Sequence, residues 1–149
     1  MRAVVQRVSR GEVRVDGAVT GRIDAGLVVY LGVGADDRDV DIVYIVEKVA
    51  GLRVFEDSAG KMNLDVAAVG GALLVVPQFT LYGDVRKGRR PAFDRAMAPA
   101  EAAAMYEAAV AAWRARGLTV ATGVFRATME VDAVNHGPIT ILLDSHRLF

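Results

Sequence analysis

The sequence predicts one α+β domain that spans residues 1–149. Several strand-like runs are followed by a helical segment, two or three more strands, a second helical segment and three final strands. Clustered strands of this kind favour mixed or antiparallel sheets over a doubly wound parallel fold. Hydrophobic residues make up 53% of the chain and charged residues 24%, so a packed core is expected and disorder is not.

The first 23 residues predict three strands. Apolar and polar residues alternate with period two in residues 2–8 and 12–16, as in strands with one buried face. Asp16 and Gly17 then form a turn signal, and a third alternating run covers residues 18–23.

A buried strand and the first helix come next. The run "LVVYLGVG" after Gly26 is apolar throughout, which is typical of a strand buried on both faces. Residues 36–50 open with three aspartates that suit a helix N-terminus, and Gly51 closes the segment. Its length favours a helix, although valine and isoleucine are frequent in it.

The rest of the chain continues this alternation. "LRVFED" predicts a strand, "DSAG" a turn and "ALLVV" a buried strand. Residues 99–116 predict the second helix, because proline opens it, alanine fills it and Gly117 ends it. Three further strand-like runs follow: "LTVATGVF", "MEVDAV" and "ITILLD".

Several classes of site are not expected. The chain has no cysteine, and its two histidines, His136 and His146, lie far in sequence from any acidic pair. No glycine-rich phosphate motif follows a strand, and no apolar run approaches the ~20 residues that cross a bilayer. We therefore expect a soluble cytoplasmic domain with no metal and no cofactor.

A basic run covers residues 84–95, "DVRKGRRPAFDR". It holds Arg86, Lys87, Arg89 and Arg90, with Arg95 beyond them. Guanidinium and ammonium groups pair with phosphates, so one interpretation is an RNA contact. The other is an ordinary solvated loop.

The stretch "VVPQFTLYGD" contains no acid, histidine or cysteine. Pro77 lacks an N–H and therefore predicts a strand edge, end or bulge, which can leave neighbouring N–H groups free for an oxyanion. Gln78 can orient a ligand, and Thr80 can serve as a nucleophile if folding supplies a base. The alternative is that Thr80 is an ordinary strand residue.

The stretch "NHGPIT" is expected to join two strands. Asn135, Gly137 and Pro138 all favour a tight hairpin turn, with His136 at its tip. The alternative is that the Gly137–Pro138 peptide, in the cis form, presents a carbonyl group to a ligand.

Together these stretches resemble the D-aminoacyl-tRNA deacylase family over essentially the whole chain. "PQFTL" is similar to the family's S-Q-F-T-L motif, and "NHGPIT" matches its N-x-G-P-x-T motif. The resemblance implies a barrel-like core with two main helices, and hydrolysis of the ester that joins a D-amino acid to the 3′ end of tRNA. It also implies cleavage of glycine mischarged on tRNA(Ala), a homodimer, and no binding to DNA or membranes.

The resemblance also implies roles for individual residues. Gly137 and Pro138 would select chirality in the partner subunit's pocket, as a cis pair. The catalytic wall would be Gln78, Phe79 and Thr80. Supporting contacts to the substrate would come from Asn135, Met129 and Arg7, and contacts to the tRNA from Arg86, Lys87, Arg89 and Arg90.

Two positions depart from the family pattern. Pro77 stands where the family usually has serine, and Arg126 where it usually has glycine. Arg126 could crowd an adenosine pocket or contact a phosphate. These departures leave a competing function open, a module that binds aminoacyl-tRNA or free D-amino acids without turnover. A third possible function is that of a hydrolase that uses threonine and acts on another ester.

Overall fold

The computed structural model describes all residues from 1 to 149. Eleven elements follow one another along the chain: β1 (Arg2–Val15), β2 (Ala18–Ile23), β3 (Gly26–Gly32), α1 (Asp39–Ala50), β4 (Phe55–Glu56), β5 (Met62–Leu64), β6 (Ala72–Pro77), the 3-10 helix η1 (Phe79–Tyr82), α2 (Pro99–Ala115), β7 (Val120–Thr122) and β8 (Glu130–Asp144). No helix is both long and apolar enough to cross a membrane.

The main sheet is mixed and nearly closed. Its strands run in the order β2-β1-β3-β6-β7, and β8 pairs with β1 on its other edge. The pairs β3–β6 and β6–β7 are parallel, and the pairs formed by β1 are antiparallel. At Gly21 in β2, an added Cβ would lie 2.5 Å from the Thr122 carbonyl oxygen in β7, so these strands approach closely. The expected α+β domain with a barrel-like core and two helices is confirmed.

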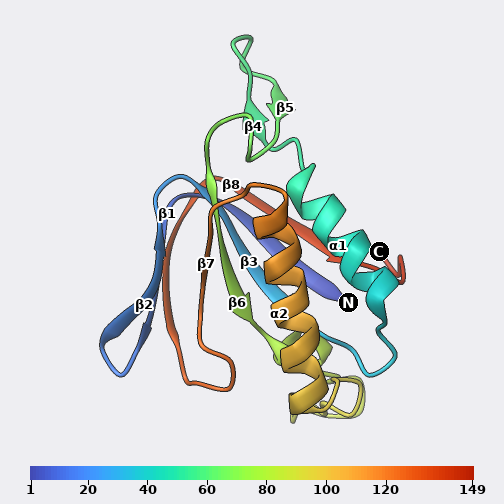
Figure 1. The fold of residues 1–149 in the computed structure, drawn as a ribbon. Helices are drawn as coiled ribbons and strands as arrows, with labels where there is room; N and C mark the ends of the chain where they lie inside the picture. Colours follow the sequence, from blue (N-terminus) through green and yellow to red (C-terminus); the bar gives the residue numbers. More distant parts are fainter.

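Side chains of the central strands alternate between two apolar clusters. Leu27, Val29, Leu73 and Val75 belong to the larger cluster, which α1 and α2 cover on one face of the sheet (Figure 1). The smaller cluster lies on the other face and contains Val8, Val13, Ile23, Val28, Leu74 and Val76. Strands buried on both faces must be apolar throughout, which explains the runs "LVVYLGVG" and "ALLVV".

Two buried polar groups tie the helices to this core. The Trp113 indole N–H in α2 donates to the Val46 carbonyl in α1 at 3.1 Å, and the Tyr106 hydroxyl donates to the Val75 carbonyl in β6 at 2.8 Å. Burial raises the pKa of Tyr106. A buried donor needs such a partner, so these bonds fix where α2 crosses the sheet.

Four expectations about strands were wrong. Residues 2–8 and 12–16 form one strand, β1. Only Phe55–Glu56 of "LRVFED" and only Val120–Thr122 of "LTVATGVF" are strands. "NHGPIT" does not join two strands as a hairpin, because it lies inside the single strand β8. Both halves of β8 pair with the same strand, β1, so the chain cannot reverse direction between them.

Candidate functional site

A pocket of about 680 Å³ opens where β6 ends. Its wall comes from β3, β6, η1, the start of α2 and the segments before α2 and β8, and 14 of its 19 residues are hydrophobic. Figure 1 shows two elements of this wall, the end of β6 and the start of α2, at the end of the molecule opposite the β4–β5 hairpin. Its size and apolar lining are typical of small-molecule sites.

The sequence positions Gln78 and Phe79 in this wall. Pro77 ends β6, as predicted, and the Gln78 N–H donates to the Leu31 carbonyl at 2.8 Å. The chain then turns into η1 at Phe79. The N–H groups of Phe79 and Thr80 open this short helix and therefore have no acceptor inside it.

Thr80 is not a strand residue, so that interpretation was wrong. It lies in η1, its side chain is exposed, and it is not part of the pocket wall. Its hydroxyl accepts a hydrogen bond from the Gln78 side-chain amide. The Thr80 side chain therefore contacts the pocket only through Gln78.

The basic run forms a loop beside the pocket. Asp84 and Ala92 exchange two backbone hydrogen bonds, of 2.8 and 2.9 Å, which close the loop. Phe93 then packs edge-on against Phe79, with ring centroids 5.0 Å apart. Phe93 also lines the pocket, so the end of the loop lies at the pocket rim.

The four cations of this loop are not equivalent. Arg86 pairs with Asp84, and hydrogen bonds from Arg86 hold the pKa of that carboxyl well below its usual range. Lys87, Arg89 and Arg90 are exposed and form no salt bridge.

"NHGPIT" forms a wide bulge in β8. Gln6 pairs with Thr140 and Val8 with Asn135, so four residues of β8 loop out opposite Arg7. The Asn135 side chain closes the bulge: its oxygen accepts from the Ile139 N–H at 3.1 Å, and its nitrogen donates to the Thr140 hydroxyl at 3.0 Å.

Gly137 and Pro138 form the exposed tip of this bulge. Gly137 has φ +127°, which only glycine adopts readily, and the Gly137–Pro138 peptide bond is cis. Beneath them, the buried Arg7 donates to the His136 carbonyl at 3.1 Å and to the Val54 carbonyl at 2.7 Å. Arg7 therefore positions the bulge.

Within one chain, the bulge and the pocket lie apart. Leu27 of β3 pairs with Arg7, whereas Leu31 of the same strand pairs with Pro77. Four strand residues span about 13 Å. The structure thus separates the predicted site residues into two groups: Gln78, Phe79 and Met129 line the pocket, and Arg7, Asn135, Gly137 and Pro138 build the bulge.

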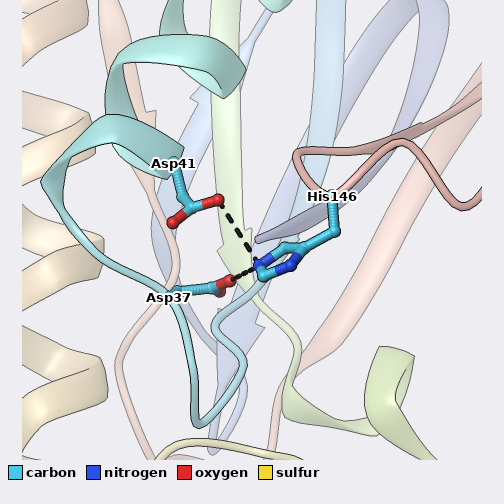
Figure 2. A group of neighbouring side chains, drawn as sticks. All are labelled: Asp37, Asp41 and His146. Atoms are coloured by element: carbon cyan, nitrogen blue, oxygen red, sulfur yellow. Dashed lines mark hydrogen bonds and ion pairs between the residues drawn. The ribbon is translucent and has the colours of Figure 1, made fainter.

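A second group of polar side chains was not predicted. The structure brings His146 to within 3.0 Å of Asp37 and 3.5 Å of Asp41, although the histidine lies far from both in the sequence (Figure 2). More than 100 residues separate His146 from both aspartates in the sequence, and only the fold joins them.

The side-chain oxygens of Asp37 are already occupied by donors of the chain. They accept from the Met1 ammonium, the Gly34 N–H at 2.6 Å and the Tyr82 hydroxyl at 3.3 Å. Burial, and then the charge of Asp37, raises the pKa of Tyr82. Asp41 accepts from the Arg38 N–H at 2.8 Å and so caps α1. We assign this group a structural role, because carboxylates with this many donors are already satisfied.

Sequence reasoning missed several walls of the pocket. Phe93, Tyr106 and Phe125 come from three separate segments, and none belongs to a motif that marks a ligand. The position of Phe93 within the basic run was the one available signal.

Known proteins share this sequence and fold. A family model described as D-Tyr-tRNA(Tyr) deacylase matches residues 4–144. Curated D-aminoacyl-tRNA deacylases of Anaeromyxobacter dehalogenans and Koribacter versatilis are 64% and 59% identical, over the full length of both chains. A solved structure named c-Myc DNA Unwinding Element Binding Protein is 38% identical, with TM-score 0.91 over 97% of this chain and 98% of that one.

A further structure, of a probable eukaryotic D-amino acid tRNA deacylase, is 22% identical and shares the fold, with TM-score 0.82 over 95% of this chain and 97% of that one. The full-length identities and the family match agree with the motifs "PQFTL" and "NHGPIT". This chain belongs to the D-aminoacyl-tRNA deacylase family, a family of hydrolases.

Proposed function

We propose that this protein hydrolyses the ester bond between a D-amino acid and the 3′ adenosine of tRNA, and also the glycyl ester mischarged on tRNA(Ala). The observation that carries this proposal is the apolar pocket, with Gln78 and Phe79 in its wall. It has room for a nucleoside and an aminoacyl group. Full-length relatives of the same family support the substrate.

The chemistry needs no side-chain acid or base. An aminoacyl ester is already activated, and holding it beside a water molecule supplies several kcal/mol of the barrier. The N–H groups of Phe79 and Thr80 can stabilise the oxyanion, a contribution of about 3 kcal/mol per donor in other enzymes. No carboxylate or histidine lines the pocket, so the ribose 2′-hydroxyl of the substrate passes a proton from the attacking water to the departing 3′ oxygen as the ester C–O bond breaks.

Chirality is selected by the bulge of a second subunit. Gly137 and Pro138 stand out from the surface and lie away from their own pocket. β8 is an edge strand with exposed apolar side chains at Val134 and Leu142, a surface suited to a second copy of the chain. In the homodimer, rigid backbone at Gly137 and Pro138 leaves no space for an L side chain, while glycine passes.

The basic loop contacts the tRNA beyond its 3′ end. Lys87, Arg89 and Arg90 are exposed, unpaired and joined to the pocket rim through Phe93. Phosphates of the acceptor stem are suitable partners for these cations, because each neutralised phosphate adds affinity without reading sequence.

One assay tests the proposed function. Catalytic amounts of protein are incubated with D-tyrosyl-tRNA and, separately, with L-tyrosyl-tRNA, and the remaining ester is measured over time. Multiple-turnover loss of the D ester alone is expected. Binding of both without turnover would instead support a non-catalytic module, and equal cleavage of both would indicate a hydrolase for another ester.

A further inference from the structure

Arg126 is the one charged residue in the wall of this mostly apolar pocket. Resting on the function proposed above, we propose that Arg126 binds the 5′-phosphate of the terminal nucleotide and is therefore a specificity-determining residue. The proposal follows from three features of this residue: its lack of a counter-ion, its backbone conformation and its place at the pocket.

Arg126 has no acidic partner in the chain. Many other arginines do, among them Arg2, Arg10, Arg14, Arg22, Arg86 and Arg116. A guanidinium group offers several donors in a planar fork that suits phosphate oxygens. An exposed arginine without a counter-ion in the wall of a pocket can therefore bind an anionic group of the ligand.

The backbone holds Arg126 in a conformation that few arginines adopt. A turn closed by the Ala127 N–H and the Val124 carbonyl, at 3.3 Å, carries Arg126 at its third position with φ +63°. The Met129 sulfur fixes the same turn, 3.4 Å from the Val124 nitrogen. A left-handed conformation is unfavourable for a residue with a side chain, and such residues gather at ligand sites.

The location of this turn fits a nucleotide. A base can stack on the aromatic pair Phe79 and Phe93 inside the pocket. The anion closest to any nucleoside is its own 5′-phosphate, which must then lie at the rim. Figure 1 shows the connection between β7 and β8, which carries Arg126, at the same end of the molecule as the start of α2. Lys87, Arg89 and Arg90 can then contact phosphates that lie farther along the tRNA.

The test compares two esters that differ in this phosphate, D-tyrosyl-tRNA and 3′-O-D-tyrosyladenosine. The protein variants are R126Q, which removes the charge, R126K, which keeps it, and the control R116Q. Arg116 follows α2 at the end away from the pocket and carries the same charge. For D-tyrosyl-tRNA we expect R126Q to raise KM about tenfold with kcat unchanged, since one charge-assisted hydrogen bond is lost. R126K should recover most of this loss, and R116Q should match the wild type.

On the adenosine ester, which lacks the phosphate, R126Q and wild type should have equal KM values. Equal losses on both esters, or no loss on either, would overturn the role of Arg126 while leaving the deacylase function intact. If the wild type cleaves neither ester, the function proposed above fails, and titration with AMP and adenosine then decides. Wild type should bind AMP about tenfold more tightly than adenosine, and R126Q should bind them equally. An AMP affinity that R126Q leaves unchanged overturns the inference.

Discussion

Two regions of the molecule differ in how many of their hydrogen-bonding groups already have partners within the chain. The group of Asp37, Asp41 and His146 has the residue types of a catalytic centre, yet its acceptors are bonded to donors of the same chain. The pocket at Gln78 and Phe79 has no acid or histidine, but it has open volume and backbone N–H groups at the start of η1.

Residue type alone therefore does not identify a ligand site. Side chains whose partners are all internal stabilise the fold, because a ligand would have to displace bonds that already exist. A ligand binds where there is space and where donors still lack acceptors. Changes in the polar group should therefore lower stability, and changes around the pocket and bulge should lower activity.

The largest effect on activity is expected for Gly137→Ala. An added Cβ would lie 2.9 Å from Ile139 Cγ1 and 3.1 Å from Arg7 Nη2, at a φ of +127°. The tip of the bulge must therefore move, and a misplacement of about 1 Å can reduce kcat/KM about 100-fold. The kcat/KM for deacylation of D-tyrosyl-tRNA measures this reduction. The control Gly17→Ala also has a positive φ but no neighbour within 4 Å, so its activity should not change.

Asp37→Asn should have the largest effect on stability. It breaks a buried ion pair and leaves the Met1 ammonium without its carboxylate, which costs about 3 kcal/mol of the free energy of unfolding. Urea denaturation measures this cost, and kcat/KM at low temperature should stay within about twofold of wild type. Asp132→Asn removes an exposed pair with Arg10 and should cost less than about 1 kcal/mol. A loss of activity without a loss of stability would contradict the structural role of Asp37.

Phe79→Ala should weaken substrate binding with little loss of stability, which is the reverse of the effect expected for Asp37→Asn. Loss of a stacking surface for the adenine raises KM about tenfold. The Phe79 side chain is 58% exposed, so the free energy of unfolding should fall by less than about 1 kcal/mol. Phe149→Ala is the control, because Phe149 is 64% exposed and is not part of the pocket. An unchanged KM in Phe79→Ala would exclude Phe79 from the binding surface.

The ionisation of Asp41 should make the free energy of unfolding depend on pH under acidic conditions. Burial raises the pKa of this carboxyl, but hydrogen bonds from Ser145 and the Arg38 N–H outweigh that effect and lower the pKa below its ordinary value. The ionised form is thus favoured in the folded state. Its contribution is present above the unfolded-state pKa of about 4 and is lost as pH falls through the lower, folded-state pKa.

Asp41→Asn should reduce stability at pH 7 by about 1 kcal/mol and flatten the pH dependence below about pH 4. Urea midpoints between pH 2 and 7 would measure both effects. If the Asp41→Asn variant loses as much stability between pH 7 and pH 2 as the wild type does, other carboxylates cause that loss.

The smallest effect is expected for Thr80→Ala. The Thr80 side chain is exposed and bonds only to Gln78, so kcat should stay within about threefold of wild type. A nucleophile would instead lose about 10⁴-fold or more. Thr80→Ser keeps the hydroxyl. Loss in Thr80→Ala together with retention in Thr80→Ser would assign the chemistry to Thr80.

Much of the fold was predictable, and the error in β8 has a clear cause. α2 was predicted to within a residue, because alanine content, an initial proline and a closing glycine are local signals. In β8, asparagine, glycine and proline are local turn signals too, but pairing with β1 on both sides overrides them. A wide bulge and a hairpin turn use the same residue types, and only the partner strand distinguishes them.

The family resemblance pointed to Gln78, Phe79 and Met129, which line the pocket. Local patterns in the sequence predicted the two helices, the buried central strands and the strand end at Pro77. Those features depend on residues close together in the chain, whose periodicity and backbone preferences act locally. Tertiary structure alone decided that Phe93, Tyr106 and Phe125 enclose the pocket and that His146 meets Asp37. It also decided that the Gly137–Pro138 tip lies away from the pocket of its own chain. Contacts between distant segments depend on strand order and register, which local preferences do not specify.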